Sequence, residues 1–310
     1  MFRIALTFAL TLLVLPAQAA DKLTLLLDWF VNPDHAPLYV AEARGYFRDA
    51  GLEVEMIAPA DPNDPPKLVA AGKADLAVSY QPQLHIQVDQ GLPLVRIGTL
   101  VATPLNSLVV LADGPIRTIA DLKGRKIGFS VGGFEDAILK AMLERAGLGL
   151  SDVELINVNF SLSPSLVSGQ VDAVIGAYRN FELNQMDIVG KPGRAFYVEE
   201  EGVPPYDELI VVAHKDRLDD PRYRRFLTAL ERGVQYLINR PQESWQLFLE
   251  INPDLDDELN RRAWRDTLPR FALRPAALDR GRYARFAEFL MAQELIGKAP
   301  PLADYAVAID

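Results

Sequence analysis

The chain has 310 residues, of which 49% are hydrophobic and 24% are charged, and it carries a formal net charge of −10 and no cysteine. A net negative charge repels phosphate backbones, which disfavours nucleic acid as a partner, and the lack of cysteine excludes disulfides, thiolate nucleophiles and cysteine metal sites. The length is sufficient for two lobes of ordinary size, whose stability must come from their hydrophobic cores.

The first twenty residues have the pattern of a secretory signal peptide. Arg3 is followed by an apolar run over residues 4–15 and then by residues 16–20, which contain an A-x-A cleavage pattern. The run is shorter than the roughly 20 residues that a membrane-spanning helix needs, and no later stretch approaches that length. We therefore expect cleavage near Ala19 or Ala20 and a soluble mature protein in the periplasm.

A pattern in the first half of the mature chain recurs in the second half. It consists of Ala-Gly-Leu with a following apolar stretch, at 50–57 and 146–156, and of Gly-x-x-Asp with a following apolar stretch, at 72–78 and 169–175. Glycine is suited to end a helix, and short apolar runs suit strands that are buried in a parallel sheet. The repeat therefore predicts an α/β fold with two similar lobes, each a mainly parallel sheet flanked by helices.

Two further apolar runs, at 107–111 and 208–213, are interpreted as a pair of crossover strands between the lobes. The region from residue 221 onward has helical periodicity and is expected to return to the first lobe. The expected segments are a signal peptide (1–20), a first lobe (21–106 and 210–310) and a second lobe (107–209).

Candidate binding residues are sought in four loops that follow predicted strands, because ligands of open α/β sheets bind beyond the carboxyl ends of the strands. In the first loop (28–35), Trp29 offers a flat apolar face with an N–H donor, and Asp28 and Asn32 offer polar edges. The alternative is that Trp29 fills core space and that Asp28 or Asp34 caps the next helix.

The second and third loops have less specific signals. In the second, Ser79 can hydrogen-bond a ligand edge beside Tyr80, although capping and packing explain this loop equally well. In the third, Gly132 and Gly133 precede Phe134 and leave backbone N–H groups facing the cleft, where a helix N-terminus favours an anion or a carbonyl oxygen. A plain tight turn is the alternative for this loop.

The fourth loop holds Tyr178, Asn180 and Glu182. If a helix begins here, Tyr178 and Glu182, which are four residues apart, project to the same side. A phenol ring beside a carboxylate suits a flat ring with amidine-like N–H groups, because the carboxylate accepts two parallel hydrogen bonds while the rings stack. The alternative is that Glu182 is a first-turn acid that answers the helix dipole.

Signals for catalysis and for metal binding are weak. The chain has three histidines, His35, His85 and His214, and no two of them are spaced to share one helix face. His35 with Asp28 and Asp34 is a poor candidate for a metal site. We expect no catalytic residue, no metal and no cofactor.

Several motifs together resemble a known family. The stretch LDWFVNPDHAPLYVA at 27–41, Gly-Tyr-Phe at 45–47, Asp-Leu-Lys-Gly at 121–124 and Tyr-x-Asn-x-Glu at 178–182 resemble the family that binds thiamin pyrimidine precursors. Its members are type II periplasmic binding proteins of ABC importers, to which fungal pyrimidine synthases are related. The likeness extends over nearly the whole mature chain. Gly-Tyr-Phe and Asp-Leu-Lys-Gly are shared with relatives that bind sulfonates or nitrate, so these two motifs indicate the fold and not the ligand.

The remaining motifs, Asp28-Trp29 with Asn32 and His35 and the Tyr-x-Asn-x-Glu motif, resemble the branch that binds formylaminopyrimidine. The resemblance implies that Tyr178 and Glu182 contact the aminopyrimidine and that Trp29 stacks on it from the other lobe. It also implies a monomer that works with an ABC permease and its ATPase. Arg179 departs from the aromatic residue that is often found at its position, which leaves open the exact substituent recognised.

Two alternatives are weighed against this function. A pyrimidine synthase would need a lysine, a histidine and a cysteine-rich loop, but Ser79 and Gln83 stand at the corresponding positions and cysteine is absent. A binding protein for another solute, such as a sulfonate, nitrate or riboflavin, would keep the fold. Because an anion site favours arginine or several N–H donors and no carboxylate aimed at the ligand, Glu182 distinguishes the aminopyrimidine from the anions.

Overall fold

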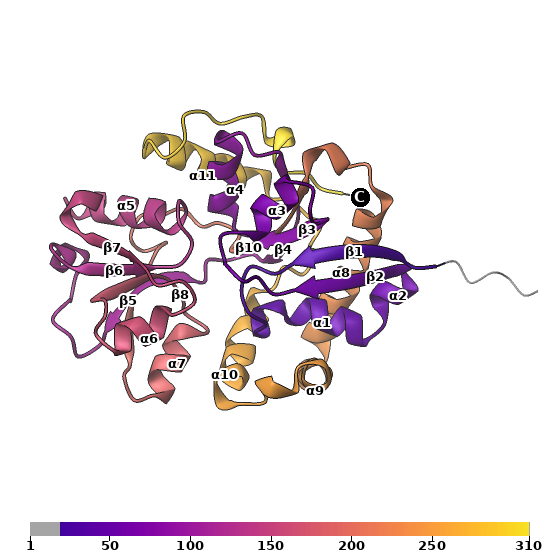
Figure 1. The fold of residues 1–310 in the computed structure, drawn as a ribbon, viewed down its shortest axis with the longest axis horizontal. Helices are drawn as coiled ribbons and strands as arrows, with labels where there is room; N and C mark the ends of the chain where they lie inside the picture. Colours follow the sequence, from indigo (N-terminus) through magenta and orange to yellow (C-terminus); the bar gives the residue numbers. More distant parts are fainter. Residues whose placement is uncertain (1–18, 310) are drawn as a thin grey trace, which may run out of the picture.

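The computed structural model describes residues 19–309 and shows two α/β lobes, each built on a five-stranded sheet (Figure 1). Four strands of each sheet run in one direction and the remaining strand, β10 or β5, runs against them. The two-lobed α/β fold predicted from the repeat is confirmed. The predicted signal peptide (1–20) lies outside the described residues except for its last two. In sheet order, the strands are β2 (Leu52–Ile57), β1 (Asp21–Leu26), β3 (Leu76–Ser79), β10 (Leu209–His214) and β4 (Leu94–Val101), and then β7 (Glu154–Asn157), β6 (Lys126–Phe129), β8 (Ala173–Tyr178), β5 (Asn106–Leu111) and β9 (Gly193–Tyr197).

The reversed strands are the two predicted crossover strands. β5 follows β4 of the first lobe but lies in the second sheet, and β10 follows β9 of the second lobe but lies in the first sheet. The two strands do not pair with each other, and their segments meet instead at Glu208. Its buried carboxylate accepts hydrogen bonds from the backbone N–H groups of Leu105 (2.6 Å) and Asn106 (2.9 Å). One buried acid therefore ties together the two connections between the lobes.

Helices cover the faces of both sheets. The long helix α8 packs on α1 and α2, and Gly233 lets its backbone approach α1 closely, since an added Cβ there would lie 2.6 Å from the carbonyl oxygen of Pro37. α10 contacts α7 of the other lobe (Figure 1). The helices of the first lobe are α1 (Ala36–Ala43), α2 (Tyr46–Asp49), α3 (Pro65–Ala70), α4 (Gln81–Asp89), α8 (Pro221–Asn239), α9 (Pro241–Ile251), α10 (Glu258–Thr267) and α11 (Arg280–Ala292), and those of the second are α5 (Glu135–Arg145), α6 (Leu162–Val167) and α7 (Glu182–Ile188).

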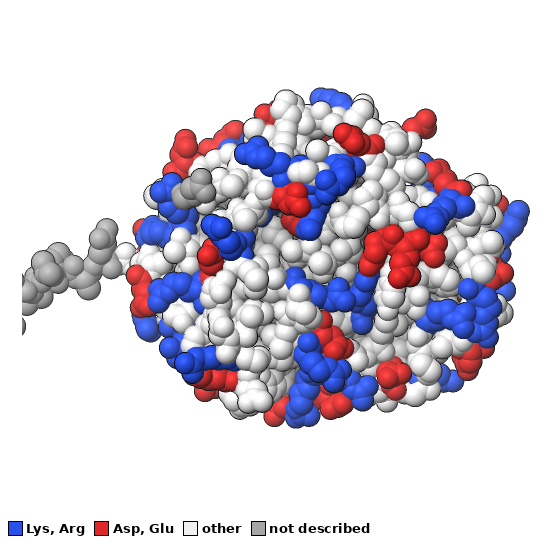
Figure 2. Space-filling view, turned by 180° about the vertical axis from the view of Figure 1, so that it is seen from behind, with Lys and Arg blue, Asp and Glu red and all other residues white. Residues whose placement is uncertain are grey.

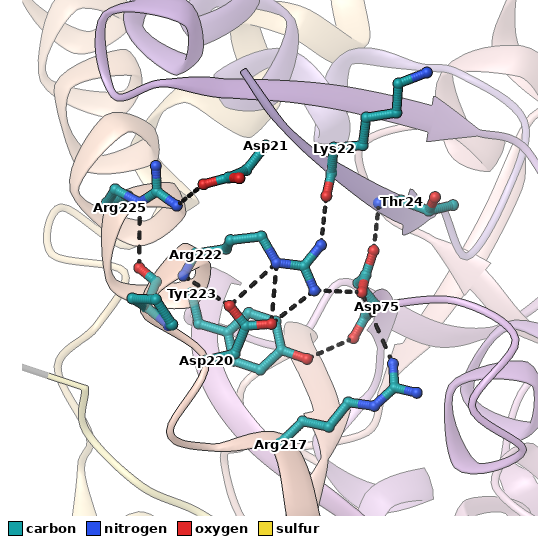
Figure 3. Close-up of polar contacts among 10 residues, drawn as sticks. Asp21, Lys22, Thr24, Asp75, Arg217, Asp220, Arg222, Tyr223 and Arg225 are labelled. Atoms are coloured by element: carbon teal, nitrogen blue, oxygen red, sulfur yellow. Dashed lines mark hydrogen bonds and ion pairs between the residues drawn. The ribbon is translucent and has the colours of Figure 1, made fainter. Parts of the chain in front are cut away.

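The aspartate of the repeated Gly-x-x-Asp pattern makes the same hydrogen bond to a neighbouring strand in both lobes. Asp75 accepts a hydrogen bond from the N–H of Thr24 in β1, and Asp172 accepts one from the N–H of Lys126 in β6, each at 2.9 Å. In the first lobe only, Arg222 of α8 also binds Asp75 (2.8 Å), as Figure 3 shows. The same aspartate therefore joins two strands and, in the first lobe, also holds the C-terminal helices.

Acidic and basic side chains are interspersed over the face of the molecule shown in Figure 2. Such mixing gives no broad positive field on that face. Within residues 19–309, no helix combines the length and the apolar character needed to cross a bilayer.

Candidate functional site

A cavity with about 440 Å³ of empty space, part of it open to solvent, lies between the two lobes. Its wall comes from the loops at the carboxyl ends of β1 and β3 in one lobe and of β6 and β8 in the other, with Leu162 of α6 and Gly176 of β8. Each of the four predicted loops contributes to this wall. The lining residues are Asp28, Trp29, Asn32, Asp34, Tyr80, Phe134, Glu135, Leu162, Gly176, Tyr178, Phe181 and Glu182.

Asp28 is fixed in place by two donors, His35 and Tyr80. The ring of His35 lies with Nε2 2.9 Å from Asp28 Oδ1, and the hydroxyl of Tyr80 donates to Asp28 Oδ2 (2.9 Å). Because Nδ1 of His35 accepts the N–H of Asn32 (3.3 Å), Nε2 carries the proton and donates to Asp28. His35 is completely buried. The structure therefore places His35, a predicted contact residue, behind the cavity wall, where it orients Asp28.

Asp34, which directly precedes His35, faces the cavity. From the sequence it was considered only as a possible helix cap or metal ligand. Asn32 shapes this short turn, since its side-chain oxygen accepts the N–H of Asp34 (2.8 Å). Asp34 Oδ1 in turn accepts a hydrogen bond from Asn180 of the other lobe (2.6 Å) and lies 2.9 Å from the hydroxyl of Thr267. Burial raises the pKa of Asp34 to about 6. Asn180 thus joins the lobes and does not line the cavity.

Tyr178 and Glu182 both line the cavity, but not on one helix as their spacing suggested. Tyr178 is the last residue of β8 and Glu182 is the first residue of α7. The Glu182 carboxyl turns back and accepts the backbone N–H of Tyr178 (2.6 Å). Burial raises the pKa of Glu182 from 4.5 to about 8, so that the group is largely protonated at neutral pH and can donate as well as accept.

Glu135 repeats this arrangement one strand away and was not predicted. It is the first residue of α5, and its carboxyl turns back to accept the N–H of Ser130 at the end of β6 (2.7 Å). Burial raises the pKa of Glu135 to about 8. The signal that could have identified it is its place as the first acid after a strand and the first residue of a helix, which it shares with Glu182.

Three other predicted residues lie off the wall. Ser79 is buried and donates to the side chain of Gln83 (2.9 Å). Gly132 and Gly133 make the turn before α5, but only the next residue, Phe134, reaches the cavity, where its ring stacks on that of Tyr80 with centroids 5.0 Å apart. The N–H of Gly132 instead donates to Asn63 of the first lobe (3.0 Å).

Aromatic rings from the two lobes meet at the cavity. Trp29 packs edge-on against Phe160 of the second lobe, with ring centroids 4.5 Å apart. The ring centroid of Phe30 lies 5.9 Å from that of Phe181. Phe181 lines the wall, although the sequence analysis did not predict it as a site residue. Trp29 is partly buried and keeps one side on the cavity, so it neither fills the core of a lobe nor stands free in solvent.

The wall is acidic. It includes four carboxyl groups, and none of its described lining residues is Lys or Arg. Arg179, next to Tyr178 in sequence, is held elsewhere by Glu199, with N–O distances of 2.6 and 2.8 Å, and by the ring of Tyr197. Among residues 19–309, no group of three or more His, Asp or Glu side chains is placed to hold a metal ion.

One sequence motif typical of hydrolases has no catalytic environment here. Residues 128–132 read Gly-Phe-Ser-Val-Gly, the G-x-S-x-G pattern, and lie at a strand-to-helix turn. The motif was not recognised in the sequence. Ser130 is completely buried, however, and its hydroxyl donates to the carbonyl of Asn159. The hydroxyl is therefore engaged in holding the turn and is not exposed as a nucleophile would be.

Comparison with known proteins identifies relatives of this chain. A family described as NMT1/THI5 like matches residues 32–244. A protein of Haemophilus influenzae that is named for thiamine biosynthesis is 55% identical over 96% of both chains. The formylaminopyrimidine-binding protein of Halalkalibacterium halodurans is 35% identical over 75% of this chain and 71% of its own.

More distant matches include an enzyme and solved structures. The 4-amino-5-hydroxymethyl-2-methylpyrimidine phosphate synthase of Legionella pneumophila is 25% identical over 87% of this chain and 88% of its own. The alkanesulfonate-binding protein of Xanthomonas axonopodis pv. citri bound to MOPS has a similar structure, with a TM-score of 0.73 over 94% of this chain and 99% of that one, at 16% identity. At that identity, the similarity shows a shared periplasmic-binding-protein fold and not a shared ligand.

Proposed function

The chain belongs to the NMT1/THI5-like family, and we propose that it is the periplasmic solute-binding component of an ABC importer that captures a thiamin pyrimidine precursor such as formylaminopyrimidine. The observation that carries this proposal is the cavity wall, which combines carboxyl groups with aromatic rings and has no Lys or Arg among its described residues. Such a wall suits a flat ligand that donates N–H bonds, and it disfavours a sulfonate or nitrate.

Glu182 is the proposed partner of the aminopyrimidine edge. That edge presents an amino N–H beside a ring nitrogen that accepts. A protonated carboxyl offers the matching pair, an O–H donor and a carbonyl acceptor, and an ionised one matches a protonated ring. Trp29 and Tyr178 line the same cavity, so stacking and edge recognition would act on one ligand.

Ligand capture would close the two lobes on each other. We propose that residues 21–106 with 210–310 move against residues 107–209 as a monomer, with the crossover segments around Glu208 as the hinge. The hydrogen bonds of Asn180 to Asp34 and of Gly132 to Asn63 (3.0 Å) join the lobes and hold the closed form. A permease and its ATPase would recognise that form.

A titration of the mature protein, beginning near residue 20, tests the ligand class. Calorimetry and thermal shift are run with formylaminopyrimidine, hydroxymethylpyrimidine, thiamin, riboflavin, taurine and nitrate. We expect the aminopyrimidines to bind and to raise the melting temperature, since a ligand that binds only the folded state stabilises it. Tight binding of taurine or nitrate, with no response to any pyrimidine, would refute the proposal.

Two substitutions at one position test the role of Glu182. Glu182→Ala should weaken aminopyrimidine binding by about 10- to 100-fold, because it removes both hydrogen bonds that the carboxyl would make to the aminopyrimidine edge. Glu182→Gln keeps one donor and one acceptor, so it should bind nearly as well as the parent if the carboxyl binds in its protonated form. Glu250→Gln, at an exposed glutamate, is the matched control. Unchanged affinity in Glu182→Ala would remove Glu182 from the mechanism.

The synthase alternative receives less support from the site. Ser79 and Gln83, at the positions where the resemblance implies a lysine and a histidine, hydrogen-bond each other in the interior. The chain also has no cysteine. These residues favour binding without catalysis.

Export is the remaining part of the proposal. Cells that express residues 1–310 should release the protein with the periplasmic fraction, and N-terminal sequencing should begin near Ala20 or Asp21. Recovery of the uncleaved chain in the cytoplasm would contradict this localisation.

A further inference from the structure

Two backbone N–H groups in the turn before α5 that could hold an anion already have partners within the chain. Glu135 Oε2 accepts the N–H of Ser130 (2.7 Å), and Asn63 Oδ1, from the other lobe, accepts the N–H of Gly132 (3.0 Å). Backbone N–H groups at such a turn are a common binding site for phosphate and sulfonate oxygens. Here a carboxyl of the chain itself occupies part of that site.

Glu135 also fills space on the wall that an anion would need. Its carboxyl lies directly over Gly176, where an added Cβ would be 2.3 Å from Oε1. Gly176 has a φ of +93°, a conformation that favours glycine. The strand β8 therefore provides a hollow for the Glu135 carboxyl, which lines the cavity although the residue is only 4% exposed.

Within residues 19–309, no Lys or Arg side chain lines the cavity to neutralise an anionic group. Arg179 is engaged by both oxygens of Glu199. Three further carboxyl groups, those of Asp28, Asp34 and Glu182, face the same cavity. A phosphate placed there would face carboxyl groups from both lobes and would find the amides of Ser130 and Gly132 already bonded.

We propose that Glu135 is a specificity-determining residue that excludes ligands bearing a phosphate or sulfonate group. It does so by occupying the Ser130 amide and the hollow over Gly176. The cavity would thus accept the phosphate-free pyrimidine and reject its phosphate ester. This inference rests on the proposed function and names the class of pyrimidine within it.

The test compares one alcohol with its phosphate ester. Hydroxymethylpyrimidine, hydroxymethylpyrimidine phosphate, propanesulfonate and inorganic phosphate are titrated into the parent protein, Glu135→Ala, Glu135→Ser and Glu135→Gln. Both small substitutions should raise the affinity for the phosphate ester relative to the alcohol by about 10- to 100-fold, the effect of one hydrogen bond to a charged group. Glu135→Gln keeps the acceptor for Ser130 and the volume over Gly176, so it should still reject the ester.

The control is Glu144→Ala, at an exposed residue of the same helix, which should leave the ratio of the two affinities unchanged. The inference is overturned if folded Glu135→Ala and Glu135→Ser keep the parent ratio, or if Glu135→Gln accepts the ester as well as they do. Failure of the proposed function is a separate result. In that case the parent protein binds no pyrimidine, while a gain of phosphate or propanesulfonate binding in Glu135→Ala still reports on Glu135.

Discussion

Replacement of Glu182 by Gln should stabilise the ligand-free protein at neutral and alkaline pH and have little effect at about pH 5. The Glu182 carboxyl is buried, and burial raises its pKa from 4.5 to about 8. Gln keeps an oxygen that can accept the N–H of Tyr178 and cannot ionise. The substitution therefore removes the ionisation of this group without removing its backbone hydrogen bond.

The size of the effect follows from proton linkage. Because the pKa is raised in the folded state, the contribution of Glu182 to stability is complete below pH 4.5 and is lost as the pH rises toward 8. In this range the unfolded chain releases the proton and the folded chain retains it. Each pH unit costs about 1.4 kcal/mol, so the difference between the variant and the parent should be about 3 kcal/mol at pH 7.

Urea denaturation of the parent, Glu182→Gln and Glu250→Gln proteins at about pH 5, 6, 7 and 8 measures this difference. Glu250 is exposed and serves as the control. The free energy of unfolding of Glu182→Gln should fall less steeply with pH than that of the parent, while Glu250→Gln follows the parent. If the curves of Glu182→Gln and the parent stay parallel from pH 5 to pH 8, the carboxyl is not held in its protonated form and the reasoning fails.

Four further substitutions test the interlobe contact, the hollow over β8 and the repeated aspartate. Asn180→Ala removes a hydrogen bond between the lobes, so ligand binding should weaken about tenfold. Small-angle scattering should show a larger radius of gyration, and an unchanged radius would contradict this role. Gly176→Ala brings a methyl group against Glu135 at a φ of +93° and should cost about 3 kcal/mol or more in urea denaturation; full parental stability would refute the close contact. Asp75→Asn should lower the free energy of unfolding by about 1–3 kcal/mol. Asp172→Asn should lower it less, because the side chain of Asp172 is 38% exposed and that of Asp75 only 17%. Equal losses of stability would contradict this argument from burial.

Local patterns in the sequence determined the architecture. Apolar runs at 107–111 and 208–213 became the crossover strands β5 and β10, and the repeated Gly-x-x-Asp pattern became the same strand contact in each lobe. These features depend on residues that are close together in the chain, because a strand needs a short apolar run and a helix end needs a residue that tolerates a left-handed turn. For the same reason, the four loops after the strands could be identified before the side chains in them were placed.

Only the tertiary structure decided which side chains in those loops reach the cavity. Asp34 and His35 are neighbours in sequence, yet Asp34 lies on the wall and His35 lies behind Asp28. Irregular loops have no periodicity that assigns side chains to a face, so their directions depend on partners far away in the chain. The hydrogen bond between Asn180 and Asp34, for example, joins residues that are 146 positions apart in the chain. The carboxyl of Glu135 lies on the wall in the space over Gly176 of β8. That space forms only when β8 and α5 pack together.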